Sequence, residues 1–300
     1  MTASRRLEGR AGAEPALPFV HPSPEEAAAR RHQGPHDAGH ASQGDEIVGA
    51  APLDDASFIA DHRTHPDSAF SRVLDRGFVE LLDTLGDDRR CVAAARVSLR
   101  RDQKSLVDDS EAQMKRDQGL LHRLMADRHT SPFEHAIFQF RVRAPIFVVR
   151  QWFRHRFASY NEESGRYIKL EDEFFLPERL RERVGKAMDY TYADMAEPEN
   201  GQTLDEIEAL YEQARGLYER LLERGVAREH ARMVLPVAQY TTFFWTVNTL
   251  SLMNFLNLRN SPHAQEEIRD YAVVIEDMFA AHMPWTHAAF REHWGPSAIR

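Results

Sequence analysis

The sequence is poor in cysteine, since Cys91 is the only one among its 300 residues. A single thiol excludes an intramolecular disulfide and any metal site built from several thiolates. Cys91 opens the run Cys-Val-Ala-Ala-Ala, which is small, apolar and typical of a helix. Because a thiol in such surroundings stays protonated and packs as a small apolar side chain, we expect Cys91 to belong to the core and not to act as a nucleophile.

Long apolar runs and excess positive charge are also missing. No stretch approaches the roughly 20 apolar residues that a membrane span requires, and no apolar segment follows the paired arginines near the N-terminus, as a secretory signal would need. The formal net charge of −9 disfavours nonspecific binding to nucleic acid or to anionic membranes. We therefore expect a cytoplasmic protein without nucleic-acid or membrane partners, in which any anion site is local.

Two regions differ in composition. Residues 1–67 are rich in Ala, Gly, Pro, Arg and His and have no sustained hydrophobic period, which predicts a disordered tail. His32, His36 and His40 recur every four residues there, but the surrounding glycines and prolines oppose a helix, so we expect no metal site. Residues 68–300 are predicted to form one domain, since 42% of the chain is hydrophobic and can supply a sizeable core.

Helical periodicity dominates this predicted domain. The expected helices are a short run through Leu81, Leu82 and Leu85, a piece from Cys91 to Ser98, a segment around Leu120 to Met125, an amphipathic helix from Ile207 to Leu221, a helix from Ala227 to Val234, one from about Thr242 to Leu258, and a last one from Pro262 to Ala281 with Ser261 as N-cap.

Strict alternation between Phe133 and Arg143 predicts a strand with one face in the core and one in water. Pro145 then suits the first turn of a helix that ends near 159–165. The core side of that helix is expected to carry Ile146, Val149, Phe153 and Phe157. The predicted fold class is α+β: a mainly helical single domain packed on a small, mostly antiparallel sheet.

The densest group of ligand-type side chains lies between Arg154 and Tyr167, in the run Arg-His-Arg-Phe-Ala-Ser-Tyr-Asn-Glu-Glu-Ser-Gly-Arg-Tyr. Guanidinium groups donate forked hydrogen bonds that suit phosphate oxygens and planar carbonyl edges, and Gly165 allows a backbone N–H to approach a ligand closely. Taken alone, the segment fits either a nucleotide site or a solvated charged face paired with Glu162 and Glu163.

The same segment resembles, at every fixed position, the Arg-His-Arg-x-x-Ser-x-Asn-x-x-Ser-x-Arg-Tyr signature of flavin-dependent thymidylate synthases. The resemblance extends over about residues 73–290, and it departs mildly in the additional tail, in a longer loop after Arg100 and at Leu250, a place that can hold arginine. Its further blocks are 129–135, 145–148, 150–153, 228–236 and 243–263.

The resemblance implies two overlapping ligand sites and no metal. For deoxyuridine monophosphate (dUMP) it implies Gln151, Arg154, Glu162, Glu163, Ser164, Gly165, Arg166, Arg232 and Arg259. For flavin adenine dinucleotide (FAD) it implies His129, Ser131, Arg154, His155, Arg156, Glu162, Asn248 and Asn254. Arg259 is implied as the catalytic residue that polarises the pyrimidine edge around N3 and O4, and Ser164 is expected to position the nucleotide.

The activity that the resemblance implies is reductive methylation of dUMP to dTMP in dTTP biosynthesis, with 5,10-methylenetetrahydrofolate as carbon donor and FAD and NADPH as reductants. It also implies a homotetramer whose active sites form at subunit interfaces. Two alternatives stay open on the residues alone: an enzyme that methylates uracil within RNA, and a nonenzymatic nucleotide or RNA binder that uses the arginine-rich loop.

Overall fold

The structure is a computed structural model that describes residues 55–100, 108–171, 173–186 and 189–295. Most of the expected tail, including His32, His36 and His40, lies outside the described residues. Helix α2 (Asp55–His62) lies within the segment expected to be tail, and its Phe58 is buried and stacks on His62. The structured part of the chain therefore begins ahead of residue 67, because one buried aromatic in an eight-residue helix leaves no readable period in the sequence.

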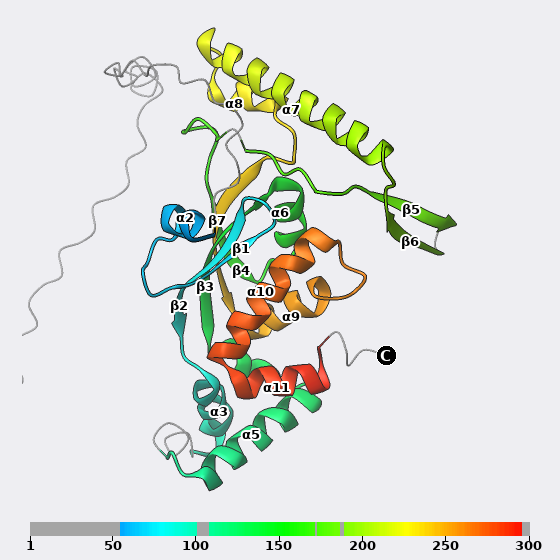
Figure 1. Cartoon of the computed structure of the whole chain (residues 1–300). Coiled ribbons are helices and arrows are strands. Elements are labelled where there is room, and N and C mark those ends of the chain that lie inside the picture. The colour runs from blue at the N-terminus through cyan, green and yellow to red at the C-terminus, as the bar shows by residue number, and fades with distance from the viewer. Residues whose placement is uncertain (1–54, 101–107, 172, 187–188, 296–300) are drawn as a thin grey trace, which may run out of the picture. The chain divides into compact units, whose positions relative to one another are not determined.

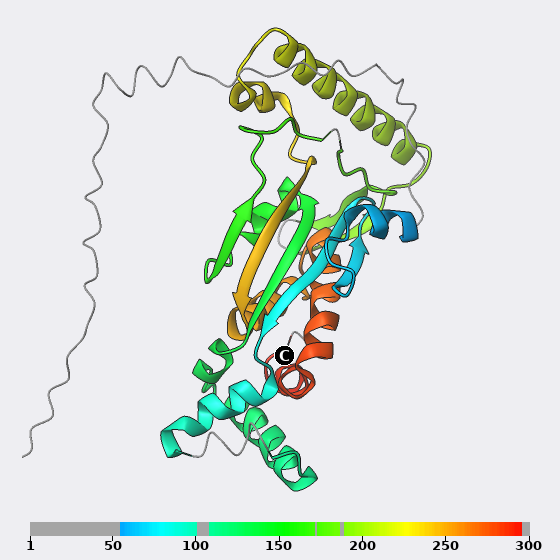
Figure 2. The ribbon, with the colours of Figure 1, turned by 90° about the vertical axis from the view of Figure 1, so that its left-hand side faces the viewer.

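A five-stranded antiparallel sheet carries the fold (Figure 1, Figure 2). Its strands, in spatial order, are β1 (Ala69–Val73), β2 (Gly77–Leu85), β3 (Ile137–Pro145), β7 (Tyr240–Asn248) and β4 (Ala158–Glu162). A separate hairpin pairs β5 (Arg181–Lys186) with β6 (Asp189–Asp194). The helices are α3 (Asp88–Arg96), η1 (Val97–Leu99), α5 (Glu111–Ala126), η2 (Ser131–Glu134), α6 (Ile146–Trp152), α7 (Glu199–Glu223), α8 (Arg228–Ala231), η3 (Arg232–Val234), α9 (Thr249–Arg259), α10 (Glu266–His282) and α11 (Pro284–His293).

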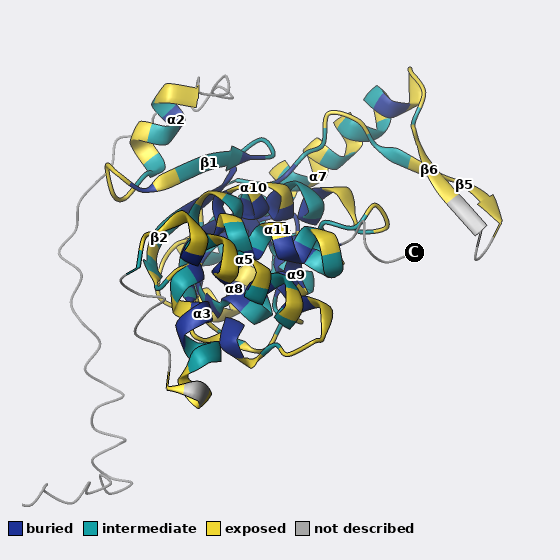
Figure 3. Ribbon diagram, turned by 90° about the horizontal axis from the view of Figure 1, so that it is seen from below, coloured by how far each residue is buried: buried dark blue, intermediate teal, exposed yellow. Residues whose placement is uncertain are grey.

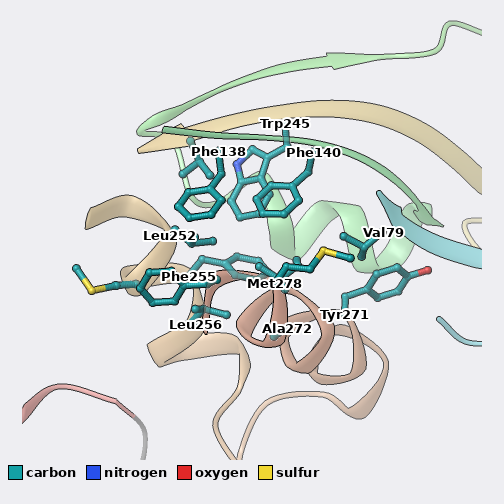
Figure 4. Packing of buried hydrophobic residues seen from close by; sticks show 14 of the residues in the cluster. Val79, Phe138, Phe140, Trp245, Leu252, Phe255, Leu256, Tyr271, Ala272 and Met278 are labelled. Atoms are coloured by element: carbon teal, nitrogen blue, oxygen red, sulfur yellow. The ribbon is translucent and has the colours of Figure 1, made fainter. Parts of the chain in front are cut away.

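The hydrophobic core lies between one face of this sheet and helices α9 and α10 (Figure 4). Phe138 and Phe140 of β3 and Trp245 of β7 are fully buried and face Phe255 of α9 and Tyr271 of α10. The Tyr271 hydroxyl donates a hydrogen bond of 2.7 Å to the Arg143 carbonyl, which ties α10 to the sheet. The burial view shows β5 and the described residues of β6 largely exposed, and α7 with exposed and intermediate residues alternating along its length (Figure 3). The predicted α+β class is confirmed. The strand predicted between Phe133 and Arg143 begins only at Ile137, because residues 131–134 form η2, and Arg143, expected on the wet face, is buried.

Two segments expected to be helical are strands. The run through Leu81, Leu82 and Leu85 belongs to β2, whose pairing with β3 shifts register between Leu81 and Asp83. That bulge adds one residue and breaks the alternation of period two, so the leucines fall at helix-like spacing. Residues 240–248 form β7, where Phe243, Trp245 and Val247 alternate inward, and the helix expected from Thr242 starts only at Thr249.

Two further helix boundaries differ from expectation. The helix after Pro145 ends at Trp152, and Phe157, expected in its core stripe, is 88% exposed. Residues 158–162 pair instead with β7, because the sheet offers backbone partners that a longer helix would leave unused. The last predicted helix begins at Glu266 behind Gln265, not behind Ser261, whose hydroxyl accepts from the His263 N–H within a turn.

Candidate active site

Helices α6 and α9 and the turn after α6 bring together a group that we call the Arg259 group: Gln151, His155 and Arg259. The Arg259 Nε donates to His155 Nε2 at 3.1 Å, and its Nη2 donates to the Gln151 carbonyl at 3.1 Å. The Gln151 side chain donates in turn to Gln265 Oε1 at 2.5 Å. Two residues expected to bind the nucleotide and one expected to bind the flavin are therefore in direct contact.

His155 is a neutral acceptor in this group. Burial, and then the charge of Arg259, lower the pKa of His155 from 6.5 to about 4. Because its Nε2 accepts from Arg259, the ring proton must sit on Nδ1 at neutral pH. Burial also lowers the pKa of Arg259. With Nε and Nη2 engaged, Nη1 of Arg259 keeps its hydrogens free within the described residues, and it is the natural donor to an electron-rich ligand edge.

A second group, which we call the Gly165 group, consists of Ser164, Gly165, Arg166 and Arg232. The Tyr167 N–H donates to the Ser164 carbonyl at 2.9 Å and closes a turn around Gly165. A Cβ on Gly165 would lie 2.7 Å from Leu170 Cδ1 and 3.2 Å from Arg232 Cδ, so a larger residue there would displace these side chains. The Arg166 Nε lies 3.5 Å from Glu229 Oε2 on α8. The Arg166 and Arg232 side chains thus both lie at a tight turn, an arrangement that suits a phosphate.

Glu162 and Glu163 connect strand β4 to the Gly165 group. Glu162 Oε1 accepts from the Thr241 hydroxyl at 2.9 Å, and the Glu163 N–H donates to the Thr242 carbonyl at 2.9 Å. The pKa of Glu163 is raised, chiefly because the packing around it removes water, although part of the residue reaches solvent. The Glu162 carboxyl and the Glu163 backbone are therefore held by strand β7 beside the turn.

Arg154 and Arg156 are exposed on the turn between α6 and β4. Neither guanidinium has a hydrogen-bond or ion-pair partner within the part of the chain that the structure describes. The alternative that the 154–167 segment is a solvated charged face paired with its own acidic residues therefore does not apply to these two residues. Both guanidinium groups are available to bind an external anion.

The remaining expected flavin residues surround the start of α9. Asn248 is the N-cap of α9, and its Oδ1 accepts from the Ser251 N–H at 2.8 Å. Asn254 is exposed on the same helix. His129 and Ser131, both exposed, precede and open η2, which packs against α9. The structure therefore brings four expected flavin residues to one region of the fold.

The Arg259 group and the Gly165 group lie at opposite ends of strand β4. Four residue steps from Ala158 to Glu162 span about 13 Å at the usual rise of a strand. No hydrogen bond or ion pair joins the two groups among residues 55–295 that are described. A hollow of about 840 Å³, lined by residues such as Arg72, Arg179 and Glu266, includes no member of either group. The expected nucleotide residues thus fall into two groups, one at each end of strand β4.

Sequence reasoning missed Gln265 and Glu229, which hold Gln151 and Arg166. Each partner lies more than sixty positions away along the chain, so no local pattern pointed to it. The expectation for Cys91 agrees with the structure: the residue is fully buried, and burial raises the pKa of its thiol to about 12. None of the described helices is long and apolar enough to cross a membrane.

The chain is similar to known proteins over most of its length. Residues 80–285 match the model of the family described as thymidylate synthase complementing protein. Flavin-dependent thymidylate synthases of Thermosipho africanus and Thermotoga neapolitana are 47% and 50% identical, each match covering 73% of this chain and 92% of the relative. A crystal structure of a UMP/dUMP methylase, PolB, from Streptomyces cacaoi bound with 5-Br dUMP is 39% identical, with a TM-score of 0.65, over 74% of this chain and 97% of that one. On this evidence the chain belongs to the flavin-dependent thymidylate synthase family.

Proposed function

We propose that this chain is a flavin-dependent thymidylate synthase, which methylates dUMP to dTMP with 5,10-methylenetetrahydrofolate as carbon donor and FAD and NADPH as reductants. The observation that carries the proposal is Arg259, whose Nε and Nη2 are fixed by His155 and Gln151 while Nη1 remains available. A donor fixed in this way stabilises negative charge on the O4 edge of a uracil ring, which makes C5 more nucleophilic. No thiolate is required, and the buried Cys91 offers none.

The residues present fit a flavin. Arg154 and Arg156 supply unpaired guanidinium groups for a diphosphate, while the Asn248 and Asn254 amides supply donors to carbonyl and ring-nitrogen edges. When bound, reduced flavin supplies the hydride that completes the methyl group. Ser164, Gly165, Arg166 and Arg232 hold the nucleotide phosphate, and Gln151 holds the base beside Arg259.

The direct test is release of the C5 hydrogen of dUMP, followed as tritium, in the presence of methylenetetrahydrofolate, FAD and NADPH. We expect release from free nucleotide that requires the folate and the reductant. Replacing Arg259 by Gln should lower kcat by about 100-fold or more, as the loss of a charge-stabilising donor does, while Arg123→Gln on the exposed face of α5 serves as the matched control. Release only from uracil within RNA, or a protein that never takes up flavin, would refute the assignment.

UMP belongs in the same experiment because of the UMP/dUMP methylase that this chain resembles at 39% identity. We expect dUMP to be preferred, and comparing kcat/KM for the two nucleotides measures the preference. Ser164→Ala should raise the KM for dUMP with little change in kcat, since Ser164 positions the phosphate. Loss of turnover at unchanged nucleotide affinity would show instead that Ser164 takes part in the chemistry.

The protein acts, we propose, as a cytoplasmic homotetramer in which each active site combines the Arg259 group of one copy with the Gly165 group of another. The separation of the two groups along β4 within one chain supports this arrangement. Among the described residues, edge strand β4 pairs on one side only, with β7, which leaves its other edge for contacts between copies.

Mixing two inactive variants tests the shared site. Arg166→Ala damages only the Gly165 group and Arg259→Gln only the Arg259 group, so tetramers assembled from both contain some sites with neither change. We expect activity to reappear when the two variants are unfolded together and refolded, and not when each is refolded alone. A mixture as inactive as its components would place all ligand residues of a site in one copy.

A further inference from the structure

Away from the residues discussed so far, helices α5 and α11 bring two imidazoles and a carboxylate together. His122 Nδ1 of α5 lies 3.0 Å from Glu292 Oε2 and 3.4 Å from His293 Nε2, both of α11. His293 Nε2 lies 3.4 Å from Glu292 Oε1. We propose that His122, Glu292 and His293 bind a divalent cation of the zinc class, which fastens α11 to α5.

The spacing of the three ligand atoms fits such a cation. Zinc binds imidazole nitrogen and carboxylate oxygen at about 2.0 to 2.2 Å in tetrahedral geometry, so neighbouring ligand atoms stand about 3.3 to 3.6 Å apart. The two nitrogens lie 3.4 Å apart, and each faces a different oxygen of the Glu292 carboxylate, at 3.0 Å for His122 and 3.4 Å for His293. Each of these distances is within a few tenths of an ångström of the range. The T-shaped arrangement of the two rings, with centroids 5.5 Å apart, lets both nitrogens face one point without ring overlap.

Without an ion, hydrogen bonds can hold this group: His122 Nδ1–H can donate to Glu292 Oε2, and His293 Nε2–H can donate to Glu292 Oε1. A cation accepts a lone pair from each of the three atoms at once. His293 is also the last residue of α11, where the partial negative charge of the helix C-terminus favours a positive ion.

The site is open to solvent in the way that three-ligand zinc sites are. The side chains of His122 and His293 are 32% and 25% exposed, and that of Glu292 is 61% exposed. An ion can therefore reach the group, with water as its fourth ligand. The helices already pack against each other below it, and Arg128 lies 4.7 Å from the Trp294 ring beside it, so the ligands converge on a preformed contact. A bound ion adds a crosslink between residues 171 positions apart.

Zinc binding to the full-length, flavin-loaded protein tests the proposal, with a chromophoric chelator as competitor. The tail histidines His32, His36 and His40 are a separate source of ligands, so the measurement is made in a background with all three changed to Gln. We expect one equivalent of bound Zn²⁺, with affinity at least about 10-fold weaker in His122→Gln and in His293→Gln. His65→Gln, an exposed histidine outside the group, is the matched control.

Two further measurements separate ligand loss from misfolding. Glu292→Gln changes an exposed side chain, and we expect it to weaken Zn²⁺ binding with an unchanged far-ultraviolet circular dichroism spectrum. Zinc at about 100 times the parent's Kd should raise the thermal unfolding midpoint of the parent by several degrees and that of His122→Gln by clearly less. The proposal would be overturned if His122→Gln, Glu292→Gln and His293→Gln all left the Zn²⁺ affinity and the midpoint shift unchanged. It would also be overturned if changing the tail histidines alone abolished Zn²⁺ binding.

Discussion

Acidification should destabilise this protein through one side chain, His155. Its pKa is about 4 in the folded chain against an ordinary value of 6.5, so the unfolded chain binds the proton more tightly. The associated stability is therefore complete above about pH 6.5 and is lost as the pH falls toward 4. The shift of about 2.5 units corresponds to about 3 kcal/mol in full, and about 2 kcal/mol is already lost at about pH 5.

Urea unfolding at about pH 7 and about pH 5 measures this loss, at fixed protein concentration and ionic strength. The parent should lose about 2 kcal/mol more than His155→Gln over that interval, because the glutamine does not titrate while all other groups remain. Arg259→Gln should reduce the loss without removing it, since burial lowers the pKa more than the charge of Arg259 does. Equal losses in the parent and His155→Gln would refute the assignment of a buried, neutral imidazole.

Three other substitutions give independent checks. Cys91→Ala should keep its turnover, because the thiol is buried and protonated, and loss of turnover with intact flavin binding would contradict this. Gly165→Ala should raise the KM for dUMP by about 10-fold or more, since a methyl group would sit 2.7 Å from Leu170 Cδ1; initial rates with normal KM would be the contrary result. Asp88→Ala should lower the free energy of unfolding by about 2 to 4 kcal/mol in urea, because the Asp88 carboxylate accepts three hydrogen bonds at the N-terminus of α11, and a smaller cost than that of a surface change would contradict the role.

Helices and strands with a regular spacing of apolar residues could be predicted from the sequence. Strands that depend on pairing with other strands could not. Helix α7 carries the apolar stripe that predicted a helix from Ile207 to Leu221, and strand β3 alternates in burial from Ile137 to Val142. Strand β2 was not predicted because its bulge interrupts the alternation of apolar and polar residues. Strand β4 was not predicted because it has only five residues and forms by pairing with β7, which no local pattern shows. The aromatic and β-branched residues of β7 did carry a strand signal, which the polar residues further along obscured.

For the candidate site, sequence reasoning supplied residue identities and the fold supplied their grouping. The resemblance in the signature segment predicted several ligand residues between Arg154 and Arg166. The distance between His155 and Ser164, however, results from strand β4, which the sequence did not predict. The pairing of Arg166 with Glu229 joins elements far apart in the chain, and only the packed structure brings them together. Propensity and spacing act locally, whereas an active site is a product of tertiary contacts.

The two ends of the Asn248 side-chain amide have different roles. Its oxygen is already committed to the first turn of α9, so only its NH₂ end is left to face a bound molecule. Whatever atom meets Asn248 must therefore be a hydrogen-bond acceptor, and the same helix end that fixes this polarity would fray if the amide turned over. The Ser251 N–H therefore fixes the orientation of the Asn248 amide, so that its NH₂ group faces the ligand. Asn248→Asp would keep the N-cap of α9 but would present an acceptor, so that this position would favour a ligand atom that donates a hydrogen bond.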